Sequence, residues 1–156
     1  MATKRKVEGM NTERAKRIGI LFDASEIDNR KAIIQYAEGL RKKGKKVNLL
    51  GYIPTVDQEA TFDFDFYTKK NTDWAGRVKA EATKKFLDRS FDLFICLSPF
   101  TTQSSEYISL QTKASMRIGP VSENKFCYDL MIDCSKETTP MLFIKQYESV
   151  LELTAV

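Results

Sequence analysis

Hydroxyl and carboxylate side chains follow three short apolar stretches of the sequence, at residues 17–22, 91–97 and 128–132. If these stretches are parallel strands, the polar side chains meet outside the carboxyl ends, where open α/β sheets bind ligands. With the positive ends of the following helices, they would form a pocket for a phosphate or a sugar. The candidate pocket residues are Asp23, Ser25, Ser98, Thr101, Thr102 and Asp133.

The same residue types also have a purely structural explanation. Serine and threonine are preferred helix N-caps, because their hydroxyl oxygen accepts a hydrogen bond from a free backbone N–H group. Ser25, with Asp28 three residues further on, resembles a capping box, and Thr101 or Thr102 could cap the next helix. We favour the capping role and keep the pocket as the alternative.

The composition argues against several kinds of catalytic chemistry. The sequence has no histidine, which is the commonest general base and transition-metal ligand. Its three cysteines, Cys96, Cys127 and Cys134, form no CxxC pair, so a structural zinc is not expected. The turn at residues 23–28 lacks the glycines that cradle nucleotide phosphates, and the acidic stretch 57–65 lacks the pattern of an EF-hand. We therefore expect no metal, no cofactor and no catalytic residue.

The net charge of +4 originates at the N-terminus. Residues 1–17 hold six basic and two acidic side chains, which leaves nineteen of each sign in the rest of the chain. Such a segment could bind a polyanion, either RNA (on a ribosome, for example) or an anionic membrane surface, and it could equally serve solubility. The polyanion-binding candidates are Lys4, Arg5, Lys6, Arg14, Lys16 and Arg17.

Two further features have a simple structural interpretation. The basic residues of 41–46 come at the expected end of a helix, where cations are favoured by the helix dipole, so they need no partner. Trp74, the only tryptophan, lies in a loop sequence. It either covers the edge of the sheet or forms an interface with a partner. We favour the cover, because the nearby Phe62, Phe64 and Phe66 need one.

Hydrophobic periodicity predicts the elements that position these residues. Apolar runs predict buried strands, spacing of three to four predicts helices, and alternation at 62–66 predicts a short strand near an edge. Strands are expected at 17–22, 46–52, 62–66, 91–97, 115–119 and 128–133, and helices at 26–43, 77–88, 102–113 and 139–153. This alternation predicts a three-layer α/β sandwich with a mainly parallel, Rossmann-like sheet flanked by helices.

The length and the termini set the expected organisation. The 156 residues suit one domain at 15–156, preceded by a basic flexible arm at 1–14. No run is long and apolar enough to span a bilayer, and the N-terminus does not resemble a signal peptide. We expect a cytoplasmic protein.

Two stretches resemble a known family. The sequences FDLFICL (91–97) and ASMRIG (114–119), joined by a polar turn and a helix, are similar to the N-terminal half-domain of heptosyltransferase-type glycosyltransferases. The resemblance spans about 30 residues and implies a shared fold and a remnant pocket on the acceptor side, with Asp23 as the carboxylate nearest to the position of the family's proposed base. The whole chain, including NTDWAG (71–76) and YDLMI (128–132), resembles small Bacteroidota proteins of a family of unknown function.

The departures from the transferase pattern affect the expected function. Those enzymes place an aspartate after a glycine in the first loop and use a second domain for the nucleotide sugar, and neither has a counterpart here. We therefore expect a non-catalytic binding or scaffolding module, with a protein partner or a polyanion at its basic arm. The alternative is a glycosyltransferase-like enzyme, or a nucleotide-sugar or phosphosugar-binding protein, that uses Asp23, Ser98 and Thr102 in a strand-end polar pocket. A third interpretation is a subunit that pairs through the edge near 62–66.

Overall fold

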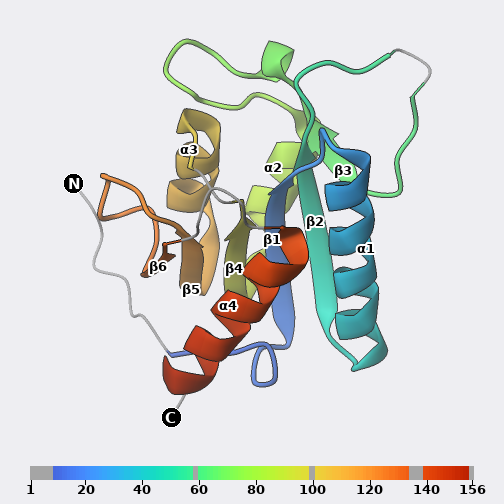
Figure 1. The fold of residues 1–156 in the computed structure, drawn as a ribbon. Helices are drawn as coiled ribbons and strands as arrows, with labels where there is room; N and C mark the ends of the chain where they lie inside the picture. Colours follow the sequence, from blue (N-terminus) through green and yellow to red (C-terminus); the bar gives the residue numbers. More distant parts are fainter. Residues whose placement is uncertain (1–8, 58–59, 99–100, 134–138, 155–156) are drawn as a thin grey trace.

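The computed structural model describes residues 9–57, 60–98, 101–133 and 139–154, in which strands alternate with helices (Figure 1). The strands are β1 (Arg17–Asp23), β2 (Lys46–Tyr52), β3 (Asp65–Tyr67), β4 (Ser90–Leu97), β5 (Lys113–Pro120) and β6 (Leu130–Ile132). The α-helices are α1 (Ile27–Lys42), α2 (Glu81–Asp88), α3 (Gln103–Gln111) and α4 (Pro140–Thr154), and a single 3-10 turn, η1 (Lys69–Asn71), follows β3.

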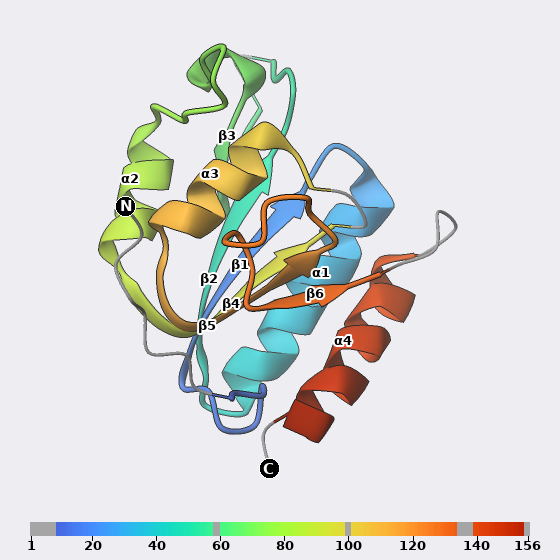
Figure 2. The same cartoon turned by 90° about the vertical axis from the view of Figure 1, so that its left-hand side faces the viewer.

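The strands form one parallel sheet in the order β3-β2-β1-β4-β5-β6. Helices α1 and α4 cover one face of the sheet, and α2 and α3 cover the other (Figure 2). The predicted three-layer, Rossmann-like architecture is confirmed. The strand order reverses between β1 and β4, and crevices for ligands form at such a point, outside the carboxyl ends of the two strands.

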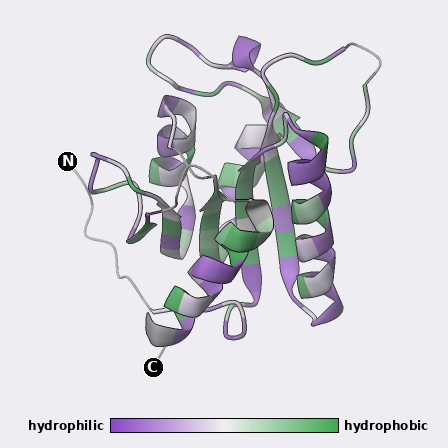
Figure 3. Ribbon diagram, viewed as in Figure 1, coloured by the Kyte–Doolittle hydropathy of each residue, from purple (hydrophilic) through white to green (hydrophobic). Residues whose placement is uncertain are grey.

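The core explains why the central strands are continuous apolar runs. In β1, Ile18, Ile20 and Phe22 belong to the core cluster under α1 and α4, whereas Leu21 belongs to the cluster under α2 and α3. Burial on both faces is typical of a parallel sheet covered by helices, and each such side chain contributes roughly 1.5–3 kcal/mol. Figure 3 shows the central strands mainly in the hydrophobic colour and η1 in the hydrophilic one.

The helices follow their predicted ranges closely, with one exception. Helix α1 buries Ile33, Ala37 and Leu40 and is followed by Gly44 with a positive φ of 86°. Helix α2 begins at Glu81 rather than near 77. Residues 72–78 instead form a tight turn closed by an antiparallel bridge between Thr72 and Val78.

The edge strand β3 is shorter than predicted, because only Asp65–Tyr67 pairs with β2. The preceding phenylalanines pack on each other and on the α1 side of the core. The Phe62 ring lies 5.3 Å from Phe64, and the guanidinium of Arg30 lies 4.7 Å from the centre of the Phe62 ring. The cover that these rings need therefore comes from α1.

Residues 9–14, part of the expected N-terminal arm, contact the folded body. Met10 and Thr12 are buried, and the Thr12 hydroxyl donates to the Glu148 carboxylate of α4 at 2.9 Å. Tyr36 of α1 donates to the same carboxylate at 2.6 Å. The part of the arm that stays a prediction is residues 1–8, which lie outside the described residues.

Candidate functional site

A small cavity lies where the strand order reverses, at the carboxyl ends of β1 and β4. Its volume is about 60 Å³, which is well below the roughly 300–1,000 Å³ of a usual ligand pocket. The polar side chains that line it are Asp23, Ser98, Thr102, Ser105, Tyr52 and Tyr67. The fold thus brings Asp23, Ser98 and Thr102 together, as the strand-end pattern predicts.

The other predicted pocket residues lie outside this lining. Ser25 hydrogen-bonds to the Asp23 carboxylate through its backbone N–H, at 2.9 Å, and through its hydroxyl. Thr101 shares a hydrogen bond with Tyr128 at 3.2 Å and donates one to Glu106. Asp133 is exposed after β6 and does not reach the cavity.

The helix caps differ from the expected ones at α1. The N-cap of α1 is Glu26, which makes no side-chain capping bond, so the expected capping role of Ser25 is wrong. Ser25 is instead held by Asp23, two residues before it, in a local turn. Thr102 does cap α3, because its hydroxyl accepts from the Ser105 N–H at 3.1 Å in a capping box.

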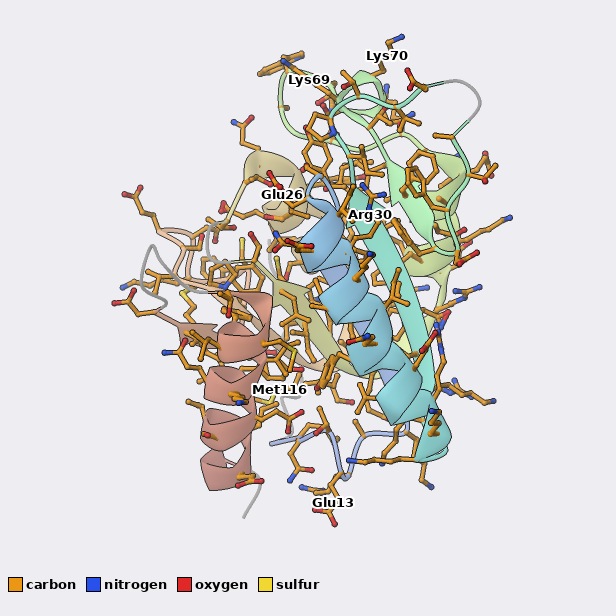
Figure 4. All side chains as sticks on the ribbon, turned by 45° about the vertical axis from the view of Figure 1, so that its right-hand side comes forward. Glu13, Glu26, Arg30, Lys69, Lys70 and Met116 are labelled. Carbon is orange, nitrogen blue, oxygen red and sulfur yellow. The ribbon has the colours of Figure 1, made fainter. Side chains whose placement is uncertain are left out.

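The electrostatics of the cavity disfavour an anionic ligand. Asp23 is its only charged lining residue, and α1 begins nearby with Glu26 at its cap and Asp28 in its first turn. These carboxylates oppose the phosphate binding that a helix N-terminus would otherwise provide. Figure 4 shows Glu26 at the beginning of α1, with Arg30 one turn further along.

The buried thiols and phenols near the cavity are poor nucleophiles. Burial raises the pKa of the Cys96 thiol to about 12 and that of Cys127 to about 11, so both thiols stay protonated near neutral pH. Burial also raises the pKa of Tyr67 and Tyr128 far above the ordinary value for a phenol. Cys134 lies outside the described residues. Among the described residues no three carboxylates, thiols or imidazoles gather in a way that would hold a metal ion.

A second feature is an excess of positive charge in residues 69–89. This stretch holds seven basic and three acidic side chains. All seven basic residues are exposed on the loop after β3, on α2 or at the start of β4. We call this set the basic strip: Lys69, Lys70, Arg77, Lys79, Lys84, Lys85 and Arg89.

The basic strip continues into a groove at the amino ends of the strands. The groove has a volume of about 380 Å³, and Arg17, Lys46 and Arg89 line it with the acidic Asp88. Arg17 and Lys46 are directly opposite each other in the β1–β2 register, an arrangement of like charges that costs stability. Within the described part of the chain, no ion pair involves these three cations.

The groove combines predicted and unpredicted residues. Arg17 is one of the expected polyanion-binding residues. Lys16, another of them, also lies next to Lys46, because the Lys16 carbonyl accepts a hydrogen bond from the Lys46 N–H at 2.8 Å. Arg14 is exposed and donates to the Gly9 carbonyl at 2.9 Å. Lys4, Arg5 and Lys6 lie outside the described residues. Arg89 is new. Lys46 belongs to the basic stretch 41–46, for which a helix end is the expected explanation, but it is the first residue of β2, and only the parallel register places it next to Arg17.

Trp74 does not cover the sheet edge, so that expectation is wrong. Its side chain is 88% exposed. Trp74 lies in the turn 73–76, which the Gly76 N–H closes by donating to the Asp73 carbonyl, whereas Arg30 packs on the phenylalanines of 62–66. The interface role of Trp74 stays a prediction.

A family model described as a family of unknown function, DUF6913, matches residues 1–153. The chain belongs to this family. This match confirms the expectation that the DUF6913 protein belongs to a family of unknown function. Neither the curated proteins nor the solved structures contain a match to it. None of the helices in the described residues is long and apolar enough to cross a bilayer.

Proposed function

We propose that this DUF6913 protein is a non-catalytic module that binds RNA through the phosphate backbone. The observation that carries the proposal is the continuity of the basic strip with the groove that holds Arg17, Lys46 and Arg89. A positively charged groove that follows the backbone is the common feature of proteins that bind single strands. Lys4, Arg5 and Lys6 of the expected N-terminal arm are further candidates for phosphate contacts.

The charge arrangement supports a polyanion as the ligand. Placing Arg17 opposite Lys46 is unfavourable for the isolated protein, and a bound phosphate would relieve the repulsion. Releasing the counterions of the phosphates would then drive binding. The overall charge of residues 18–156 is balanced, with nineteen basic and nineteen acidic side chains, but the stretch 69–89 holds seven basic and three acidic ones.

The shape of the surface favours RNA over a membrane. The groove is concave, and its volume of about 380 Å³ suits a strand that enters it. Basic residues alone are attracted to an anionic membrane surface, but stable anchoring adds an apolar face that enters the headgroup region. The groove offers only Phe91 as an aromatic lining residue, and Phe91 is buried.

The test measures the affinity for a fluorescent oligouridine by anisotropy at several salt concentrations. The full chain should bind with strong salt dependence, and the double variant Lys84→Gln/Lys85→Gln should bind more weakly. If both lysines contact phosphates, the slope of log K against log salt should fall in magnitude by about 1.4. The control is Lys31→Gln/Lys145→Gln, which removes two exposed lysines from α1 and α4. Equal losses in both variants, or binding to anionic vesicles but not to RNA, would contradict the proposal.

A second candidate function is binding of a phosphosugar or nucleotide sugar at the strand-end cavity, as the heptosyltransferase resemblance implies. Its support is the position of the cavity, where strand order reverses. The small volume and the carboxylates of Asp23, Glu26 and Asp28 weigh against it. A thermal-shift series with phosphosugars and nucleotide sugars tests this candidate, and the absence of any shift would remove it.

A further inference from the structure

An exposed aromatic side chain, Trp74, lies in sequence between Lys70 and Arg77 of the basic strip. Trp74 is 88% exposed, the most exposed of the large apolar side chains in the described residues. Such a side chain lowers its free energy by leaving water, so a fold that keeps it outside gains nothing from it internally. An indole in this position is suited to contact a ligand.

The turn that carries Trp74 is held by several hydrogen bonds and an ion pair. The Gly76 N–H donates to the Asp73 carbonyl at 3.0 Å, and the Asp73 N–H donates to the Arg77 carbonyl at 3.0 Å. The Asp73 carboxylate accepts from the N–H groups of Ala75 and Arg77 and pairs with the Arg77 guanidinium at 2.7 Å. The Thr72–Val78 bridge closes the base of the turn. Binding would therefore require little ordering of the backbone around the indole.

The charges around Trp74 indicate which ligand would stack on it. Lys69, Lys70 and Lys79 are exposed on the residues that flank the turn, and Asp73, the acidic residue of the turn, is paired with Arg77. Figure 4 shows Lys69 and Lys70 projecting from the end of the molecule where α1 begins. An aromatic ring beside unpaired lysines suits a ligand that combines flat rings with phosphates.

We propose that Trp74 stacks on an unpaired base of single-stranded RNA while the neighbouring lysines contact its phosphates. This inference rests on the RNA binding proposed above and makes it specific for single strands, because the bases of a duplex are stacked on each other and are not available. Stacking on aromatic side chains is tolerant of sequence, since every base has a flat face. All four homopolymers should therefore engage Trp74.

Two signals measured on the same samples separate this inference from the proposed function. Anisotropy of a labelled RNA reports binding, and the fluorescence of Trp74, the only tryptophan, reports contact with the indole. We expect single-stranded RNA to quench the tryptophan emission and a duplex of the same length to bind without quenching. Trp74→Ala should weaken single-strand binding by about 5- to 150-fold, Trp74→Phe should weaken it less, and neither should change duplex binding.

The outcomes are distinguishable. If RNA binds with the salt dependence described but leaves the tryptophan emission and the Trp74→Ala affinity unchanged, the stacking inference is overturned and the RNA-binding function stands. If no RNA changes the anisotropy, the proposed function fails. Quenching by a protein partner but not by RNA would assign Trp74 to a protein interface and would also overturn the inference. Circular dichroism of both variants shows that the fold is intact, which the full exposure of Trp74 leads us to expect.

Discussion

Gly76 lies directly against Gln103: a Cβ atom on Gly76 would lie 2.6 Å from the Cβ of Gln103 and 2.9 Å from its backbone carbonyl carbon. Gly76 also has a positive φ of 81°, which side chains other than hydrogen disfavour. The contact fixes the turn of Trp74 on the first residue of α3. The position of the exposed indole therefore depends on Gly76, a residue with no side chain of its own.

Gly76→Ala should lower the stability and displace the turn. We expect a loss of about 1–2 kcal/mol from the left-handed conformation, with a further loss from the contact with the Gln103 backbone. The matched control is Gly39→Ala, because Gly39 lies within α1, and a Cβ there would meet no atom within 4 Å. That control should stabilise the protein by roughly 0.4–1 kcal/mol. Urea unfolding of both variants checks the prediction, and a Gly76→Ala variant as stable as the wild type would contradict it.

Lys46→Gln should stabilise the protein and weaken RNA binding. The change removes the repulsion between Lys46 and Arg17, which is worth about 0.2–1 kcal/mol for a directly opposite pair. It also removes a cation from the groove. Thermal unfolding and anisotropy should therefore move in opposite directions. A variant that loses both stability and affinity would show that Lys46 is a structural residue.

Deleting residues 2–8 should leave thermal unfolding nearly unchanged, because the packed N-terminal residues Met10, Thr12 and Ala15 remain in place. RNA affinity and its salt dependence should both fall, since Lys4, Arg5 and Lys6 are lost. Thr12→Val provides the contrast, as it removes the hydrogen bond to Glu148 and should lower stability by about 1 kcal/mol. Unchanged RNA affinity after the deletion would exclude the arm from the binding surface.

The buried thiols should make the protein less stable in alkali. The pKa of Cys96 is raised from an ordinary value near 9 to about 12, so the folded state retains a proton that the unfolded state loses. The contribution of the protonated Cys96 thiol to the free energy of unfolding is complete below pH 9. It is lost between about pH 9 and about pH 12, at up to about 1.4 kcal/mol per pH unit. At pH 8 a Cys134→Ser variant should react with a thiol reagent only after unfolding. Rapid labelling of the folded variant would contradict this burial.

The sequence was sufficient to predict the layers and most elements, because the apolar pattern of a covered parallel sheet is strong. The runs at 17–22 and 91–97 are buried on both faces, and the amphipathic spacing of Ile33, Ala37 and Leu40 defines α1. Once the strands are predicted, the residues at their carboxyl ends are known, and those of neighbouring parallel strands lie at one edge of the sheet. The proximity of Asp23 and Ser98 was therefore also predictable. The start of α2 was not, because the Thr72–Val78 bridge competes with helical spacing there.

The features of the basic surface depended on tertiary contacts. Nothing in the residues around Lys46 places it opposite Arg17, since the two are joined by register across α1. Arg89 looks like an ordinary residue at the end of a helix until the groove at the strand ends is seen. The neighbouring phenylalanines favour a position for Trp74 at the sheet edge, but Arg30 of α1 contributes the cover that their rings need. The residues next to a loop aromatic do not indicate whether its side chain is buried or exposed.

The most direct measurement is the quenching of Trp74 emission by iodide compared with caesium at equal, low ionic strength. The basic strip should concentrate the anion and repel the cation near the exposed indole. Relative to free N-acetyltryptophanamide, iodide should therefore quench Trp74 more strongly and caesium more weakly, and added salt should reduce the difference. The same ratio of iodide to caesium quenching as in the free compound, or a blue-shifted emission that neither ion reaches, would contradict an exposed tryptophan in a positively charged surface.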